Sequence, residues 1–336
     1  MSNITTKILS HIRKKAAGYH ACSLLFFILL SACATGPQTE QLLRERALQA
    51  VAHIDDVPFI AQQEYQCGPA ALAMVLRYRG IDVDSEQLKP QVYLPGRNGS
   101  LQIEILAATR RYHRIPYIIN PRLEDLLREI AAGNPVLVLQ NLGLQWAPRW
   151  HYAVVIGYDL KRQVIILHSG TEPARETALI TFERTWQRSD MWGIVVTGPE
   201  QVPVSAEPEH FVDAVESLHD AADQPVRLQA YLSATRAWPE ALLPRLALGN
   251  SYYQAGNLSA AENSFRIAAE QHPDSVMALN NLAQTLADLH RADEALPVIR
   301  HAASLGGSFA AIVRQTQQAI EKQLSETRNQ PSPPRH

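Results

Sequence analysis

The chain has 336 residues, of which 46% are hydrophobic, and its 31 basic residues nearly balance its 33 acidic ones, giving a formal net charge of −2. This composition is typical of a globular protein, and the length suits two domains. Because the net charge is small and no basic cluster follows the first 33 residues, we expect no binding to nucleic acid.

The N-terminal segment has the pattern of an export signal. Basic residues precede the apolar run "ACSLLFFILL", which is too short to span a bilayer. The run leads into "LSAC", Leu30 to Cys33, which resembles the bacterial lipobox. That resemblance implies that residues 1–32 are removed as a signal peptide and that a lipidated Cys33 anchors the chain in a membrane.

The residue after Cys33 is Ala34, and no Asp retention signal is present. By resemblance to Gram-negative lipoproteins, this suggests the outer membrane, with the protein facing the periplasm. An ordinary secretory signal cleaved nearby is the alternative, and it would leave Cys33 free.

The cysteine count limits the chemistry of the mature chain. Cys22 leaves with the signal and Cys33 is consumed by lipid, so Cys67 alone remains and no internal disulfide can form. An unpaired cysteine in an oxidising compartment is either buried and inert or a reactive thiol. Without a second cysteine, and with scattered histidines, we expect neither a metal site nor a cofactor.

The region up to residue 133 is predicted to be mainly helical. We interpret the polar residues 37–56 as a spacer from the membrane and 57–63 as a short strand or extended segment. Pro69 in the first turn and Gly80 past the end predict a buried helix from Gly68 to Arg79. Periodicity and capping residues predict further helices over 84–92, 101–112 and 121–133, with a strand at 115–119.

The pattern then changes to short β-rich runs separated by turn residues. They are "PVLVLQN", "HYAVVIGY", "QVIILHS", "ALITF" and "WGIVVT". Helices followed by an antiparallel sheet indicate an α+β domain that ends near Gly198. The proline-rich segment after it is interpreted as a linker.

Beyond the linker the chain is helical and repeats every 34 residues, as in the pairs Pro239 and Pro273, Leu248 and Leu282, and Phe265 and Ile299. The segment "LALGNSYYQAGNLSAAENSFRIAAEQHPD" resembles the tetratricopeptide repeat. A degenerate copy follows, with His290 at the position of Gly256 and Pro297 in its second helix. Tyr231 and Ala234 occupy the positions of Phe265 and Ala268 and suggest a leading copy. Stacked pairs of this kind form an all-α array.

Cys67 immediately precedes the predicted helix that starts at Gly68. The first amides of a helix have no internal acceptors and carry a partial positive charge, which favours thiolate over thiol. This placement suits a nucleophilic cysteine. The alternative is a small apolar residue buried at a helix start.

Among the histidines, His151 has the most suitable position for a general base. It stands where the loop "LGLQWAPRW" meets the apolar strand "HYAVVIGY", held by the sheet while facing the loop. His113, His272, His290 and His301 lie in charged or repeat segments and are interpreted as surface residues. A strand-end histidine with ordinary hydrogen bonds is the alternative for His151.

The stretch "VPFIAQQEYQCGPAALAMVLRYRG", together with "HYAVVIGYD", resembles the bacteriocin-processing, double-glycine type of papain-like cysteine peptidase. The resemblance covers residues 55–197 and implies that Cys67 is the nucleophile and His151 its base. It also implies that Gln62, five positions before Cys67, helps to form the oxyanion hole, with Gln63 as the alternative.

The sequence departs from that family after the histidine strand. The family has an Asp there that orients the imidazole, whereas this chain has His168, Ser169 and Gly170. Folding the two strands as a hairpin about Lys161 pairs residues whose numbers sum to about 322. Ser169 or Thr171 would then accept a hydrogen bond from His151.

The expected layout follows from these features. It comprises a signal peptide (1–32), a spacer after lipidated Cys33 (33–54), a papain-like cysteine peptidase domain (55–198), a linker (199–209), tetratricopeptide-like repeats (210–322) and a disordered tail (323–336).

We therefore expect a membrane-anchored cysteine peptidase that hydrolyses a peptide or protein substrate, with repeats that bind a protein partner. Acyl transfer to an amine would use the same chemistry. Members of the family commonly trim peptides after Gly-Gly beside export transporters, but this chain has no transporter segment, so that substrate class is not favoured. The alternative is a catalytically silent lipoprotein that serves as an interaction scaffold in the cell envelope, which the missing Asp favours.

Overall fold

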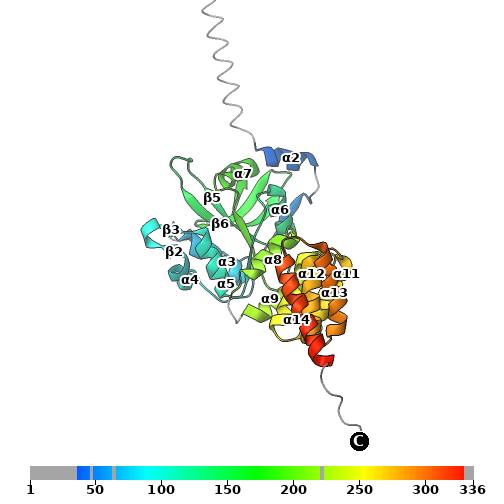
Figure 1. The fold of residues 1–336 in the computed structure, drawn as a ribbon. Helices are drawn as coiled ribbons and strands as arrows, with labels where there is room; N and C mark the ends of the chain where they lie inside the picture. Colours follow the sequence, from blue (N-terminus) through cyan, green and yellow to red (C-terminus); the bar gives the residue numbers. More distant parts are fainter. Residues whose placement is uncertain (1–35, 46–47, 63–65, 220–222, 329–336) are drawn as a thin grey trace, which may run out of the picture.

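The computed structural model describes residues 36–45, 48–62, 66–219 and 223–328. The signal peptide, Cys33, Gln63 and the end of the predicted tail lie outside these residues. Figure 1 shows an α+β part built around one sheet and, beside it, a part made of helices alone. Among the described residues, no helix is both long enough and apolar enough to cross a membrane.

The sheet has seven strands, and all of its pairings are antiparallel. Six strands follow the order β4-β9-β5-β6-β7-β8, and β1 pairs with the far end of β6. The strands are β1 (Val51–His53), β4 (Ile115–Ile118), β5 (Val136–Asn141), β6 (Trp150–Asp159), β7 (Val164–Ser169), β8 (Glu172–Ala178) and β9 (Gly193–Thr197).

Helices cover the sheet, and in Figure 1 one group is drawn below it and another above it. The lower group is α3 (Cys67–Tyr78), α4 (Ser85–Val92) and α5 (Gln102–Arg111); the upper group is α2 (Pro37–Glu45), α6 (Leu123–Ala131) and α7 (Leu179–Gln187). A short second sheet pairs β2 (Tyr93–Leu94) with β3 (Gly99–Ser100) next to α3. This arrangement is the predicted α+β fold.

The helix that carries the candidate nucleophile forms as predicted. Residues 68–76 of α3 are all buried, and the small side chains among them, Gly68, Ala70, Ala71 and Ala73, allow the helix to lie close against β6. The helix ends before Gly80, whose φ of +76° is a left-handed conformation that glycine adopts without strain.

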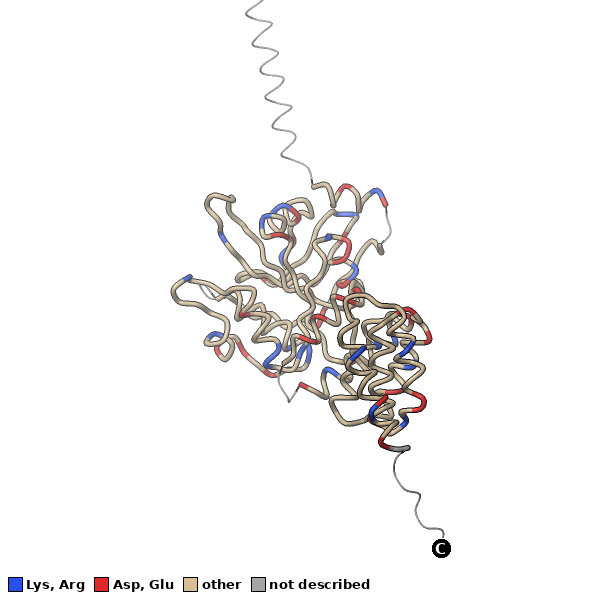
Figure 2. Tube along the Cα trace, viewed as in Figure 1, with Lys and Arg blue, Asp and Glu red and all other residues tan. Residues whose placement is uncertain are grey.

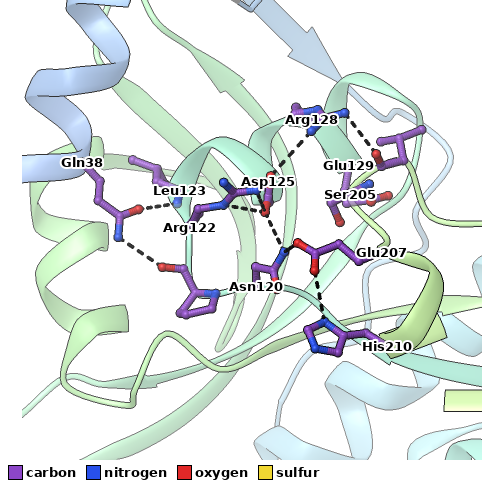
Figure 3. A network of polar contacts seen from close by, with 12 residues as sticks. Gln38, Asn120, Arg122, Leu123, Asp125, Arg128, Glu129, Ser205, Glu207 and His210 are labelled. Atoms are coloured by element: carbon purple, nitrogen blue, oxygen red, sulfur yellow. Dashed lines mark hydrogen bonds and ion pairs between the residues drawn. The ribbon is translucent and has the colours of Figure 1, made fainter. Parts of the chain in front are cut away.

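The interpretation of residues 33–54 as a spacer is wrong for the part that the structure describes. The carboxylate of Glu183, which is fully buried, accepts hydrogen bonds from the backbone amides of Gln38 and Thr39 and from the Thr39 hydroxyl, and so fixes the start of α2. The Gln38 side chain also binds the backbone of Pro121 and Leu123 at the start of α6 (Figure 3). These contacts link distant segments, so sequence periodicity could not show them.

The run "ALITF" was predicted as a strand and is helical, since it opens α7. Leu179, Phe182 and Trp186 are fully buried at helical spacing, a pattern that a five-residue window cannot reveal. Conversely β8, "EPARETA", is mostly exposed and has no apolar alternation, so no strand is predicted there from the residues.

The predicted hairpin register is confirmed at the end of β7 that faces His151. Val154 pairs with His168 and Val155 with Leu167, so both pairs sum to 322. A β-bulge between Val155 and Gly157 shifts the register by one residue beyond that point.

The second part consists of stacked helices. They are α8 (Pro208–Glu216), α9 (Gln224–Ala237), α10 (Leu242–Gln254), α11 (Leu258–Gln271), α12 (Val276–Asp288), α13 (Ala292–Leu305) and α14 (Ala310–Arg328). The equivalent positions Tyr231, Phe265 and Ile299 are all buried, as the 34-residue repeat predicts. The expected disorder from residue 323 is wrong up to Arg328, because α14 continues to that residue.

The structure explains why glycine stands at two positions of the repeat. A side chain at Gly249 would meet the Phe265 ring at 2.4 Å, so only glycine fits between α10 and α11. Gly256 turns the chain with a φ of +75°, and His290 takes the same left-handed conformation in the degenerate copy, with a φ of +59°.

The two parts share an apolar core and a polar network. Phe211 of α8 packs against Tyr117 of β4 and Trp238 at the end of α9. In the network shown in Figure 3, Asn120 binds Glu207, which also contacts His210 of α8. The repeats are therefore packed directly against the sheet domain.

Candidate active site

The predicted site residues gather around a cavity of about 800 Å³. One wall is the β2–β3 segment from Arg97 to Gln102, and the opposite wall comes from β5 and β6. The other lining residues of interest are Gln62, Cys67, Leu139, Trp150, His151, Tyr152, Gly170, Ser189 and Asp190.

Cys67 is the first residue of α3 and is partly buried. Burial raises the pKa of the Cys67 thiol, and this effect is larger than the opposing effects of the backbone of Tyr152, Gly68 and Cys67 itself, which favour the thiolate. The expectation of a thiol held ionised by the helix start is therefore wrong for the free protein. The helix amides act in the predicted direction, but desolvation outweighs them.

His151 lies near the start of β6, opposite Gln140 of β5, and its Nε2 is 2.9 Å from the Oγ of Ser169. Burial, together with the charges of Arg175 and Arg149, lowers its pKa to about 4. The imidazole is therefore neutral at physiological pH. In the tautomer that carries its proton on Nε2, this N–H donates to Ser169 and Nδ1 is left as a base.

Tyr152 connects the candidate residues through its backbone. β6 pairs with β7 only from Val154 onward, so the amide and carbonyl of Tyr152 are not used in that ladder. The Tyr152 backbone acts to lower the pKa of the Cys67 thiol, against the larger effect of burial, and the Tyr152 carbonyl accepts a hydrogen bond from Gln62 at 3.1 Å. Cys67 and His151 therefore line the same cavity, together with Tyr152, the residue that follows His151. Among the described contacts, no hydrogen bond joins the thiol to the imidazole.

The orientation of Gln62 is fixed by its partners. Its Oε1 accepts from the Gly170 amide at 3.1 Å and its Nε2 donates to the Tyr152 carbonyl, so oxygen and nitrogen cannot be exchanged. The backbone amide of Gln62 also donates to the Gly170 carbonyl at 2.9 Å. One of the two Nε2 hydrogens is sufficient for the Tyr152 contact, which leaves the second for another acceptor.

The structure distinguishes between the two predicted imidazole partners. Ser169 is buried and binds His151, whereas Thr171 is exposed in the turn between β7 and β8. The departure from the family pattern therefore places a neutral hydroxyl where a carboxylate was expected.

Several residues of the site were not singled out from the sequence. Arg149 precedes the histidine strand, and Arg175 lies on β8, which carried no strand signal. The Tyr152 backbone was also missed, although its position next to His151 was visible. In the described part of the chain, no group of three His, Cys, Asp or Glu side chains could hold a metal ion.

Comparison with known families supports the division into a peptidase-like domain and helical repeats. Residues 54–191 match the Peptidase C39 like family. The chain carries a C39-like peptidase domain. Residues 246–308 match the tetratricopeptide repeat, so the C39-like peptidase domain is followed by C-terminal repeats.

Solved structures resemble each part separately. A putative C39-like peptidase from Bacillus anthracis is 19% identical with a TM-score of 0.38, and the match covers 44% of this chain and 98% of that chain. The Sgt2 TPR domain of Aspergillus fumigatus is 14% identical with a TM-score of 0.34, covering 38% of this chain and 86% of that chain. The type III secretion chaperone SycD of Yersinia enterocolitica, in complex with a peptide of the translocator YopD, is 13% identical with a TM-score of 0.33, covering 35% and 93%.

No curated protein matches the chain.

Proposed function

We propose that this protein is a cysteine peptidase in which Cys67 is the nucleophile, His151 the base and Gln62 an oxyanion donor. The observation that carries the proposal is that all three side chains line one cavity, with Ser169 bound to the imidazole. The C39-like peptidase domain supports the same reaction class.

The low pKa of His151 and the raised pKa of the Cys67 thiol favour a neutral pair before substrate binds. As the sulfur attacks the substrate carbonyl carbon, the thiol proton moves to Nδ1 of His151 and a carbon–sulfur bond forms. The second hydrogen of Gln62 Nε2 and the Cys67 amide would stabilise the oxyanion. The imidazolium then gives its proton to the leaving amine.

Water completes the cycle. His151 removes a proton from a water molecule that attacks the thioester, the acid product leaves, and the sulfur recovers its proton from the imidazolium. An amine in place of water would give acyl transfer through the same steps.

We further propose that the repeats bind a protein partner and that lipid on Cys33 anchors the chain to the outer membrane, facing the periplasm. Tetratricopeptide repeats suggest a protein partner. A groove of about 340 Å³ runs between α8, α10, α12 and α14, with Leu246, Met277 and Phe309 among its lining residues. Such a groove would hold an apolar segment of the partner.

Comparison of the envelope proteome between wild-type cells and a Cys67→Ala strain tests the proposed activity. We expect uncleaved precursor proteins to accumulate in Cys67→Ala and equally in His151→Ala, while an Ile103→Ala control, at an exposed position on α5, behaves as wild type. Identical proteomes in all strains, at equal protein levels, would contradict the peptidase.

The second candidate is a non-cleaving scaffold, and one observation favours it: the partner of His151 is the neutral Ser169 hydroxyl and not a carboxylate. A scaffold requires the groove in the repeats but not the thiol. Co-purification of one partner with wild type and Cys67→Ala alike, without any change in precursor proteins, would favour this function.

A further inference from the structure

We propose that the tip of the β5–β6 hairpin, residues 142–150, is a docking surface for the lipid bilayer, and that it lies beside the point where the chain is anchored. The inference rests on the proposed lipid anchor at Cys33. It adds a second contact with the membrane and places the mouth of the catalytic cavity near the bilayer.

Large apolar side chains are unusually exposed on this hairpin tip. Trp146 is 83% exposed, Trp150 56%, Leu144 54% and Leu142 44%. Scattered single exposures are ordinary, but a cluster of this size on one projecting hairpin marks an interaction surface. Trp is enriched where proteins meet the interface between water and lipid.

The tip is held in shape by its own contacts. The Asn141 side chain accepts hydrogen bonds from the amides of Gly143 and Arg149, both at 2.9 Å, and Leu144 and Ala147 exchange backbone hydrogen bonds. A side chain at Gly143 would meet the Ala147 carbonyl oxygen at 2.4 Å, so the tight turn requires glycine there. The apolar side chains are therefore presented by a preformed structure.

The start of the described chain lies at the same side of the molecule as the tip. Gln38 of α2 and Gln145 of the tip line one cavity, and Figure 1 shows α2 and the tip of the hairpin at the same end. Cys33 precedes Gly36, the first described residue, by three positions, a reach of about 10 Å at most for an extended chain. Because Glu183 and Leu123 hold the start of α2, a lipid on Cys33 would keep the tip close to the bilayer surface.

The charge of the tip also suits a bilayer with anionic lipids. Arg149 is the only charged residue between Asn134 and Tyr158, and Figure 2 shows the hairpin almost free of charge colours. Arg188 lies beside Gln38 and Gln145 in the same cavity, where Asp190 is the acidic residue. An apolar tip whose single charge is the arginine Arg149 matches an anionic headgroup layer over a hydrocarbon core.

Docking would also orient the catalytic site, since Trp150 lines the cavity of Cys67 and His151. Substrates would then be polypeptides held at the membrane surface, not ones free in solution. A second copy of the chain or a soluble peptide are the other possible occupants of the tip.

The test uses the full, lipidated chain in vesicles of phosphatidylethanolamine and phosphatidylglycerol with bromine-labelled acyl chains, which quench tryptophan fluorescence on contact. We expect quenching of the wild type and loss of most of it in a Leu144→Asp/Trp146→Asp double variant, which retains Trp150 as a reporter. The matched control is Ile103→Asp, an apolar position on α5 that is 64% exposed. It should be quenched like the wild type.

Absence of quenching in the wild type, or equal quenching in the hairpin variant, would overturn the proposal. So would a concentration-dependent dimer that the hairpin variant abolishes, or a soluble peptide that protects Trp146 without lipid. Labelling of Cys67 by a peptidyl electrophile in the same samples reports on the thiol separately. If Cys67 is labelled but tryptophan is not quenched, the docking proposal is wrong and the peptidase proposal stands. If tryptophan is quenched but Cys67 is not labelled, the peptidase proposal is wrong and the docking proposal stands.

Discussion

His151 and Ser169 are joined by a hydrogen bond of 2.9 Å between Nε2 and Oγ. The serine stands where the resembling peptidases have a carboxylate, so it orients the imidazole without a charge to stabilise an imidazolium. Burial, together with the charges of Arg175 and Arg149, lowers the pKa of His151 to about 4, and the neutral serine supplies no negative charge to oppose them.

A Ser169→Asp variant should therefore raise the pKa of His151 by about 1–3 units, because an opposite charge at hydrogen-bonding distance favours the protonated ring. NMR titration of the imidazole measures this directly. Ser169→Ala should leave the pKa low and slow peptidyl-electrophile labelling of Cys67 about tenfold, through loss of orientation. Thr171→Ala, at the exposed turn, is the control and should change neither. An unchanged His151 pKa in Ser169→Asp would contradict the assignment.

The Cys67 thiol should react slowly with iodoacetamide at neutral pH and progressively faster in the alkaline range. Burial raises its pKa above the ordinary value of 9.0, so little thiolate is present at pH 7. The rate should be measured from pH 6 to pH 11 in wild type, with Cys67→Ser to subtract other modification. A rate that is already at its plateau at pH 7 would show instead a preformed thiolate–imidazolium pair.

Acid should destabilise the fold through His151. Its folded-state pKa of about 4 lies below the usual 6.5, so the unfolded chain binds the proton first as the pH falls. The stability contribution is complete above pH 6.5 and is lost between pH 6.5 and pH 4, by about 3 kcal/mol at most. Urea unfolding at a series of pH values should show this loss for wild type.

A His151→Gln variant should lose less stability over the same pH interval, because it has no imidazole to protonate. Arg175→Gln should show a smaller loss than wild type, since one charge that lowers the pKa is removed. Equal pH dependence in wild type and His151→Gln would contradict the prediction.

His290→Gly should stabilise the repeats by up to about 1 kcal/mol, because glycine adopts the left-handed conformation that His290 holds at a φ of +59°. The weak contact of His290 with Gln323, at 3.5 Å, would be lost at little cost. Thermal or urea unfolding measures the change. Gly256→Ala, the reverse change at the equivalent position, should destabilise the repeats; a stabilising effect there would show that the turn conformation is not the cause.

The sequence by itself determined the elements whose signals are local. Pro69 and Gly80 bounded α3, and the 34-residue spacing located the repeats. The hairpin register narrowed the partner of His151 to Ser169 or Thr171, and the structure selected Ser169. These features depend on backbone conformation and on alternation or periodicity along the chain. Such signals are local, so they can be read from the residues before the fold is known.

Tertiary structure alone decided the rest. α2 and β1 joined the sheet domain because Glu183 and the edge of β6 supply partners from more than a hundred residues away. The ionisation of Cys67 depended on how much surrounding protein displaces water, and this outweighed the helix amides that the sequence had revealed. Desolvation is a property of all the atoms around a group, so no local stretch of sequence determines it.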